Sequence, residues 1–455
     1  MTRNKLQQAG GHPPNEKAWV IGLGQTGLSC VRYLAARGYR VSVMDTRAQP
    51  PKLSELRAEF PGIELYTGGL DARLLRQAGF LVVSPGVSLR EPAIVQALTA
   101  GVQAVGDIEL FVKEARAPIV AITGANGKST VTSLVGAMCR EAGQAACVAG
   151  NIGVPVLSAL DQPRPDIYVL ELSSFQLETT FSLNARAATV LNITPDHMDR
   201  YRDVDEYAAA KARIFHGDGV MVMNSDDPRV MRMARAGRRI VRFGLTPPKD
   251  DRDYGVITRA GEEWLVQGDH PLISSKEVPL PGRHNLANVL AAMALAEASG
   301  VPLAAMQRAV IDFKGLAHRT ELVAERDGVR WINDSKGTNV GAAVAALMGM
   351  TSPVVLIAGG DGKGADFSPL KAAVARHARA VVLIGRDAPL IEAALAGAAP
   401  VSYADDMQRA VAQARLLAHL GDIVLLSPAC ASFDMFDNFE HRGQVFAQTV
   451  REMLR

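Results

Sequence analysis

The stretch APIVAITGANGKSTVTSLVGAM, residues 117–138, decides the fold. An apolar run typical of a buried strand is followed by a turn with two glycines and a lysine, and then by a helical pattern. Such a turn presents backbone N–H groups and a helix N-terminus to an anion, so it predicts an α/β domain that binds the phosphates of ATP. The predicted phosphate loop consists of Gly124, Ala125, Asn126, Gly127, Lys128, Ser129 and Thr130.

This loop carries suitable groups for phosphate binding but departs from the strict P-loop pattern. Lys128 can reach the terminal phosphates, and the hydroxyl of Ser129 or Thr130 can hold Mg²⁺. The strict pattern requires glycine at position 122, where Ile122 stands, so the loop is a shortened variant, G-x-x-G-K-S-T. The alternative is a glycine-rich turn with a solvated lysine. The strand before the loop and the helix after it favour phosphate binding.

A second glycine turn lies about a hundred residues earlier, in AWVIGLGQTGLSCVRYLAARG, residues 18–38. Gly22, Gly24 and Gly27 follow a strand pattern, and Asp45 ends the next one, as in the dinucleotide fingerprint. Taken alone, this turn favours a nicotinamide-dependent dehydrogenase. That interpretation leaves the phosphate loop unexplained.

Short β-branched runs alternate with Ala/Leu-rich helical patterns along the whole chain, which predicts α/β domains with parallel sheets. We divide the chain near 107 and near 315. The predicted domains are a Rossmann-like domain at 17–107, a P-loop domain at 108–315 and a second Rossmann-like domain at 316–455. Ligands bind at the carboxyl ends of parallel strands, so we expect one cleft shared between domains.

Composition excludes several classes of partner. The 455 residues are 48% hydrophobic and carry a net charge of +2, which gives no reason to expect nucleic acid. No apolar run approaches the ~20 residues of a membrane span, and residues 1–16 are a polar, frayed tail rather than a signal peptide. The four cysteines show no short paired spacing, so neither disulfides nor zinc are indicated. We expect a cytoplasmic monomer that binds small molecules.

Two further polar stretches follow apolar strands of the central domain. Glu171 ends the run DIYVLE, at a position where nucleotide-binding folds place a Mg²⁺ ligand, although a lone acid there is usually solvated. Asp196 and His197 follow another apolar strand and so are expected to point into the same cleft. Asp203 and Glu206 have the spacing of a capping box, and on the helix that they begin, Tyr207 and Lys211 share a face. A solvated lysine and a structural histidine are the alternatives.

Ten ordered blocks resemble the Mur ligases of bacterial peptidoglycan synthesis. Together with the glycine turn that begins at Gly22, these blocks extend the resemblance from residue 22 to residue 443, which is nearly the whole chain. The last three blocks resemble the D-glutamate-adding members in particular. The blocks are TGANGKST, GNIG, ELSSFQLE, DHMDRY, KARIF, GRHN, HRTE, NDSKGTN, GGDGKGADF and LLSPACASFDMFDNFEHRG.

The resemblance implies an ATP-dependent amide ligase with two nucleotide sites. ATP phosphorylates a carboxylate, and the amine of D-glutamate then attacks the acyl phosphate. The first domain binds UDP-N-acetylmuramoyl-L-alanine, the central domain binds ATP, and the third presents the amino acid. Two glycine turns are present because two nucleotides are bound.

The resemblance also implies roles for individual residues. Lys128, Glu171, His197 and Lys211 are catalytic; Ser129 or Thr130 and Glu171 hold one Mg²⁺, while His197 and Lys211, as a carbamate, hold a second. ATP further contacts Asn285, Asn288, Arg319, Asp334 and Lys336. The UDP substrate contacts Gln25, Thr26, Asp45, Thr46, Arg47, Asn151, Ser173 and His197. D-Glutamate contacts Thr338, Lys363, Ser432 and Phe439.

Two more interpretations stay open beside the dehydrogenase. An ATP-gated regulatory module would hydrolyse ATP without a carboxylate and an amine substrate. Folylpolyglutamate synthase shares the shortened loop but lacks an N-terminal Rossmann-like domain of this kind, so residues 17–107 argue against it.

Overall fold

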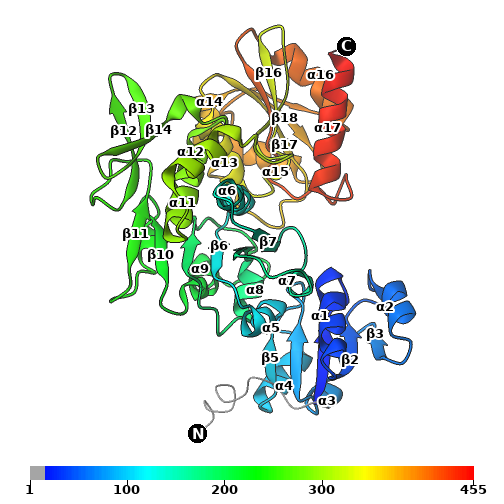
Figure 1. The fold of residues 1–455 in the computed structure, drawn as a ribbon. Coiled ribbons are helices and arrows are strands. Elements are labelled where there is room, and N and C mark those ends of the chain that lie inside the picture. Colours follow the sequence, from blue (N-terminus) through cyan, green and yellow to red (C-terminus); the bar gives the residue numbers. More distant parts are fainter. Residues whose placement is uncertain (1–15, 455) are drawn as a thin grey trace.

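The computed structural model describes residues 16–454, and Figure 1 shows three α/β domains that follow one another along the chain. Residues 1–15, which carry nearly all of the predicted frayed tail, and residue 455 lie outside the described part. The three-domain α/β class predicted from the sequence is confirmed. Within residues 16–454 no helix is long and apolar enough to cross a membrane.

The N-terminal domain is a five-stranded parallel sheet of order β3-β2-β1-β4-β5. The apolar runs around Trp19 and Leu81 form its centre, where both side chains are fully buried. The short strand β3 was not predicted, because ELYT is mostly exposed and lacks an apolar run. The elements are β1 (Lys17–Ile21), α1 (Gln25–Ala36), β2 (Arg40–Asp45), α2 (Leu53–Glu59), β3 (Glu64–Thr67), α3 (Ala72–Leu75), β4 (Phe80–Val83), α4 (Pro92–Thr99) and β5 (Gln103–Val105). Helix α5 (Asp107–Glu114) follows and packs on the central domain.

The central domain is a nine-stranded sheet of order β14-β13-β12-β11-β10-β9-β6-β8-β7. Strands β6 to β11 pair in parallel, whereas β12, β13 and β14 form an antiparallel extension at one edge. Its strands are β6 (Ile119–Thr123), β7 (Ala146–Gly150), β8 (Ile167–Glu171), β9 (Ala187–Val190), β10 (Val220–Asn224), β11 (Ile240–Phe243), β12 (Tyr254–Arg259), β13 (Glu262–Gln267) and β14 (His270–Ser274). Its helices are α6 (Lys128–Glu141), α7 (Val156–Ala159), α8 (Ser174–Glu178), α9 (Val204–Ala212), η1 (Arg213–Phe215), α10 (Pro228–Met231), η2 (Ser275–Glu277), α11 (Arg283–Ala298) and α12 (Leu303–Asp312).

The C-terminal domain is a six-stranded sheet of order β15-β16-β20-β17-β18-β19, parallel except for the β15–β16 hairpin. Its elements are β15 (Glu321–Arg326), β16 (Val329–Asn333), α13 (Val340–Gly349), β17 (Val354–Gly359), α14 (Leu370–His377), β18 (Ala378–Ile384), α15 (Ala388–Leu395), β19 (Val401–Tyr403), α16 (Met407–Leu417), β20 (Ile423–Leu426) and α17 (Phe439–Met453).

The loops at the carboxyl ends of β6, β8, β9 and β16 all reach the same region between the central and C-terminal domains. This is the edge where parallel sheets bind ligands. The proposed boundaries at 107 and 315 fall at the start of α5 and in the connection between α12 and β15.

Candidate active site

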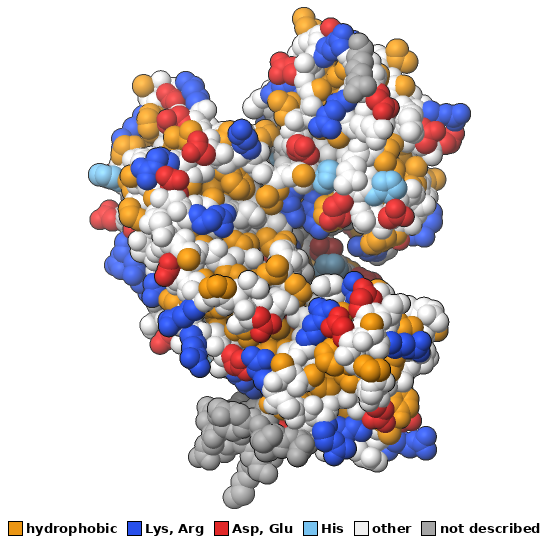
Figure 2. All heavy atoms as spheres, turned by 45° about the vertical axis from the view of Figure 1, so that its right-hand side comes forward, with side chains coloured by type: hydrophobic (Ala, Val, Ile, Leu, Met, Phe, Trp, Pro, Cys, Tyr) orange, Lys and Arg blue, Asp and Glu red, His pale blue; other side chains and the backbone are white. Residues whose placement is uncertain are grey.

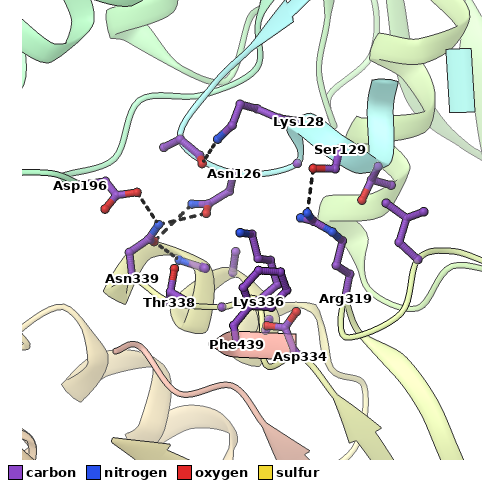
Figure 3. A pocket seen from close by; sticks show the side chains of 18 of the residues that line it. Asn126, Lys128, Ser129, Asp196, Arg319, Asp334, Lys336, Thr338, Asn339 and Phe439 are labelled. Atoms are coloured by element: carbon purple, nitrogen blue, oxygen red, sulfur yellow. Dashed lines mark hydrogen bonds between the residues drawn. The ribbon is translucent and has the colours of Figure 1, made fainter. Parts of the chain in front are cut away.

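A cavity of about 530 Å³ lies between the central and C-terminal domains. Figure 2 shows the molecule hollowed between the C-terminal domain and the N-terminal domain, and Figure 3 shows part of the cavity lining. Twenty of the predicted site residues line the cavity: Ala125, Asn126, Gly127, Lys128, Ser129, Thr130, Asn151, Glu171, Ser173, His197, Lys211, Asn285, Asn288, Arg319, Asp334, Lys336, Thr338, Lys363, Ser432 and Phe439.

The phosphate loop connects β6 directly to α6, which begins at Lys128. Gly127 caps the helix with φ of +84°, and a Cβ there would lie 2.4 Å from Oδ1 of Asn288. Glycine is therefore required both by the left-handed backbone and by the close approach of Asn288. The Lys128 ammonium donates to the carbonyls of Gly124 and Ala125 at 2.9 Å each, and burial lowers its pKa.

Asn288 is fixed in this position by its neighbour on α11. Its Nδ2 donates to Oδ1 of Asn285 at 2.9 Å, and Asn285 donates to the carbonyl of Pro281 at 2.7 Å. Both side chains are buried beside the phosphate loop. They are placed where an amide could contact a nucleotide base.

Glu171 presents an unsatisfied carboxylate oxygen at the end of β8. The residue is 2% exposed, and its Oε1 accepts from Nδ2 of Asn151 at 2.8 Å. Its Oε2 is buried without a hydrogen-bond partner. A buried carboxylate oxygen is costly unless it is paired, so this atom fits a divalent cation.

Ser173 follows Glu171 but uses its hydroxyl for local structure. The hydroxyl accepts from the N–H of Gln176 at 3.2 Å, and the Gln176 side chain accepts from the N–H of Ser173, which completes a capping box for α8. Ser173 therefore contributes to the cavity wall as a helix cap.

Lys211 is buried against the phosphate loop. It is 1% exposed, its Nζ donates to the Gly124 carbonyl at 2.9 Å, and it lies 4.5 Å from the ring centroid of Tyr207. The alternative of a solvated helix lysine is therefore wrong. Burial, and secondarily the charge of Lys128, hold the pKa of Lys211 well below its usual value.

The helix that carries Lys211 has half of the predicted capping box. Asp203 accepts from the N–H of Glu206 at 2.8 Å. The Glu206 side chain, however, accepts from the N–H of Arg202 at 2.9 Å and from the side chain of Arg90, in the N-terminal domain, instead of returning to Asp203. This interdomain partner could not be read from local spacing.

His197 lies in the loop after β9 in a left-handed conformation, with φ of +59°. Its ring packs edge-on against Phe175 at 4.8 Å between centroids, and its pKa is lowered, chiefly by burial. A left-handed histidine is a strained backbone position that often marks a functional site. Both rings line the cavity.

The described residues contain no cluster of three or more His, Cys, Asp or Glu side chains that could hold a metal ion. A cation here would need oxygen from hydroxyls, phosphates or a modified lysine in addition to Glu171. The unsatisfied Glu171 oxygen is the one observation that favours such an ion.

Arg319 joins the two domains across the phosphate loop. Its guanidinium donates to the hydroxyl of Ser129 at 2.7 Å (Figure 3). Next to it, the buried Asp334 accepts from the N–H of Thr320 at 3.2 Å and from the hydroxyl of Ser427 at 2.8 Å, and burial raises its pKa to about 6.

Lys336 continues this C-terminal wall. Its Nζ lies 3.9 Å from the ring centroid of Phe439, and burial lowers its pKa to about 8. Thr338 lies two residues further on, and Ser432, 2% exposed, lies on the loop after β20. Lys363 is exposed on the loop after β17 but also reaches the cavity wall. Cationic and hydroxyl donors therefore gather on one side of the cavity.

Contacts at Asn339 and Arg442 beside the cavity, and the partner of Asp196, were not predicted from the sequence. Asn339 caps α13 and donates to Asn126 Oδ1 at 3.2 Å and to Asp196 Oδ2 at 3.1 Å (Figure 3). Asp196 lies in the loop after β9 and lines the cavity, and the sequence assigned it no individual role. Arg442, 1% exposed, donates to carbonyls of Cys430 and Ser335, which holds the two C-terminal loops together. No local motif signals any of these contacts, since each joins distant segments.

The predicted uridine set lies in the N-terminal domain and does not line the cavity. Asp45 is 1% exposed; its carboxylate accepts from the N–H of Leu23 at 2.6 Å and pairs with Arg47 at 2.7 Å. It therefore holds the first glycine turn in shape. The other members are Gln25 and Thr26 at the start of α1, and Thr46 after β2.

The fold and the cavity define a three-domain α/β enzyme with an anion-binding cleft between its second and third domains. Family models match the chain as Mur ligase MurD-like, N-terminal domain (residues 16–106), Mur ligase middle domain (122–296) and Mur ligase, glutamate ligase domain (318–430). The chain belongs to the Mur ligase family.

Curated relatives match the chain along nearly its whole length. The protein named UDP-N-acetylmuramoylalanine--D-glutamate ligase in Nitrosococcus oceani is 56% identical, covering 96% of both chains. The proteins of the same name in Thiobacillus denitrificans and Pseudomonas aeruginosa are 52% and 51% identical, covering 100% and 95% of this chain and 98% and 97% of their own.

Solved structures show the same fold at low identity. The UDP-N-acetylmuramate-alanine ligase of Thermotoga maritima is 18% identical with a TM-score of 0.58, covering 96% of this chain and 99% of that one. A pseudomurein peptide ligase type C of Methanothermus fervidus is 16% identical with a TM-score of 0.59, covering 96% and 100%.

Proposed function

We propose that the chain is an ATP-dependent carboxylate–amine ligase that adds D-glutamate to UDP-N-acetylmuramoyl-L-alanine in peptidoglycan precursor synthesis. The observation that carries this function is the composition of a single cavity. A phosphate loop, a carboxylate with one unsatisfied oxygen and a wall of cationic and hydroxyl groups line the same cavity of about 530 Å³. Relatives more than 50% identical over nearly full length carry the corresponding name.

The reaction proceeds in two steps that the cavity can position. An oxygen of the alanine carboxylate attacks the γ-phosphorus of ATP, so that ADP leaves and an acyl phosphate forms. The amine of D-glutamate then attacks the acyl carbon, phosphate leaves, and the amine loses a proton. Lys128, the loop N–H groups and Arg319 balance charge on the transferring phosphoryl group.

Mg²⁺ would supply further neutralisation of the phosphates and orient them. Glu171 and the hydroxyls of Ser129 and Thr130 are the groups that would hold one ion. The free Glu171 oxygen supports this choice, and the Ser129 hydroxyl is within reach of Arg319 as well. His197 and Lys211 are the groups that would hold a second ion, which would supply further charge neutralisation.

Lys211 would serve that role as a carbamate. An ammonium cannot bind a cation, and CO₂ adds only to an unprotonated amine. Burial beside Lys128 lowers the Lys211 pKa and so favours the neutral amine. The product carries a carboxylate-like group beside the phosphate loop.

D-Glutamate carries two carboxylates, so its site requires hydrogen-bond donors and cationic side chains. Thr338, Lys363, Ser432 and the ring of Phe439 supply hydroxyl, cationic and apolar contacts on the C-terminal wall. Use of ATP and a UDP-linked substrate supports action in the cytoplasm.

Phosphate release tests the proposal when ATP, UDP-N-acetylmuramoyl-L-alanine and D-glutamate are each withheld in turn. We expect sustained release only with all three, and preference for D- over L-glutamate. ATP hydrolysis that needs neither the carboxylate nor the amine substrate would instead support an ATP-gated module.

The amino-acid site is tested by Lys363→Ala and Ser432→Ala. Each should raise KM for D-glutamate about tenfold while KM for ATP stays within about twofold, since a charge-assisted hydrogen bond contributes about 1.5–3 kcal/mol. Lys371→Ala is a matched control, because this exposed lysine lies on α14 outside the cavity. Equal effects on both KM values would remove these residues from the amino-acid site.

A further inference from the structure

One side chain of the loop after β9 crosses into the N-terminal domain. Arg200 lies three residues after His197, and its side chain is 14% exposed. Its guanidinium donates to the carbonyls of Pro85 and Val87 at 3.0 and 2.9 Å. Two hydrogen bonds from one rigid, charged fork fix direction as well as distance.

The N-terminal segment that Arg200 holds packs against the first glycine turn. The Ser84 hydroxyl donates to the Gly22 carbonyl at 3.0 Å. A Cβ on Gly22, which has φ of +93°, would lie 3.0 Å from Cγ2 of Val87. Arg200 therefore hydrogen-bonds to the loop at residues 84–87, and this loop contacts the glycine turn that we assign to the UDP end of the substrate.

On its other side, Arg200 contacts the wall of the catalytic cavity. Its guanidinium lies 4.3 Å from the ring centroid of Phe175, a cation–π contact, and 3.5 Å from Oε2 of Glu178. Phe175 packs edge-on against His197. Direct contacts thus lead from Gly22 through the segment 84–87, Arg200 and Phe175 to His197.

A second bridge joins the same two domains nearby. Arg90 donates to the carbonyl of Arg200 at 3.2 Å and to the carboxylate of Glu206. Glu206 lies in the first turn of α9, the helix that carries Lys211. The N-terminal domain therefore contacts both central elements that carry the proposed metal ligands His197 and Lys211.

We propose that Arg200 is a positioning residue, which sets the UDP-binding domain at a fixed distance from His197 so that the two ends of one long substrate meet their sites together. The proposal rests on the proposed function, because only a UDP-linked substrate spans both domains. Arg90 reinforces the same placement. Neither arginine lines the cavity.

Arg200→Ala should separate binding of the whole substrate from binding of its nucleotide end. We expect KM for UDP-N-acetylmuramoyl-L-alanine to rise about tenfold and kcat to fall about 100-fold, because misplacement of about 1 Å can cost that much. The Kd of UDP alone, measured by titration calorimetry, should stay within about twofold of the wild type, since UDP contacts one domain and the strength of its contacts is unchanged. If Arg200 acted only on the UDP site, the KM of UDP-N-acetylmuramoyl-L-alanine and the Kd of UDP would instead rise equally.

Three companion variants complete the test. Arg90→Ala alters a side chain that is 52% exposed and should show the same pattern more weakly without unfolding the protein. Arg200→Lys keeps the charge but loses the two-pronged guanidinium. Its KM and kcat should lie between those of the wild type and those of Arg200→Ala. Arg229→Ala is the control, because that half-exposed arginine pairs only loosely with Asp205, at 3.8 Å within its own domain.

Unchanged kinetics in Arg200→Ala and Arg90→Ala, or a loss of UDP affinity equal to that of the whole substrate, would overturn the proposal. A wild-type protein that releases no phosphate with all three substrates would refute the proposed function instead. Thermal unfolding of each variant, measured in parallel, distinguishes a positioning effect from loss of the fold.

Discussion

Lys211 illustrates how burial changes the chemistry of a single residue. A lysine four positions after a tyrosine on a short helix is usually solvated, and there its amine would be an ammonium at neutral pH. In this protein it is enclosed by the phosphate loop and Tyr207, with its Nζ on a backbone carbonyl. Desolvation favours the neutral amine, which is the form that reacts with CO₂.

Lys211→Ala should therefore lower kcat by about 100-fold or more, as loss of a group that stabilises the transferring charge does. Short carboxylic acids in the buffer should partly restore activity by supplying the missing carboxylate. Wild-type protein in ¹³C-bicarbonate should show a carbamate resonance that Lys211→Ala lacks. Lys276→Ala, which alters a 76% exposed lysine, is the control. A wild-type spectrum without that resonance would contradict the carbamate.

The elements that the sequence predicted best are those with local signals. Glycine spacing and the apolar run before it located β6 and the start of α6 at Lys128, and Asp203 correctly marked the start of α9. Strands β3 and β7 were missed because ELYT is mostly exposed and ACVAG has a single fully buried residue, so neither forms an apolar run. The roles of Asn339 and Arg442 could not be predicted, because their partners lie up to 213 and 107 residues away.

Asn339→Ser tests the contact at the start of α13. Serine still accepts from the helix N–H groups, so the cap is kept, but it loses the amide that donates to Asn126 and Asp196. We expect kcat to fall about tenfold, the equivalent of about 1.4 kcal/mol, with little change in thermal unfolding. Thr99→Ser, a mild change on the exposed end of α4, controls for substitution itself. Wild-type kcat in Asn339→Ser would show that the contact between domains has no part in turnover.

At the scale of the whole molecule, two glycine turns serve two domains. The second turn and groups of the C-terminal domain together line the cavity, whereas the first turn lies outside the cavity. Arg200 and Arg90 connect the N-terminal domain to the loop of His197 and to α9. Arg319 and Asn339 connect the C-terminal domain to the phosphate loop. The central domain is thus held from both sides by hydrogen bonds close to its site.

This arrangement predicts that the two nucleotides respond to different substitutions. Arg47→Ala should raise KM for the UDP substrate about tenfold and leave KM for ATP unchanged, because one charged contact is lost outside the ATP cavity. Arg47 is 49% exposed and is a better target than Asp45, whose carboxylate also accepts from the Leu23 N–H.

Lys128→Ala should abolish phosphate release while calorimetry shows unchanged affinity for the UDP substrate, since the Lys128 Nζ lies over the second glycine turn and not the first. If Arg47→Ala weakened ATP instead, the two glycine turns would be assigned the wrong way round.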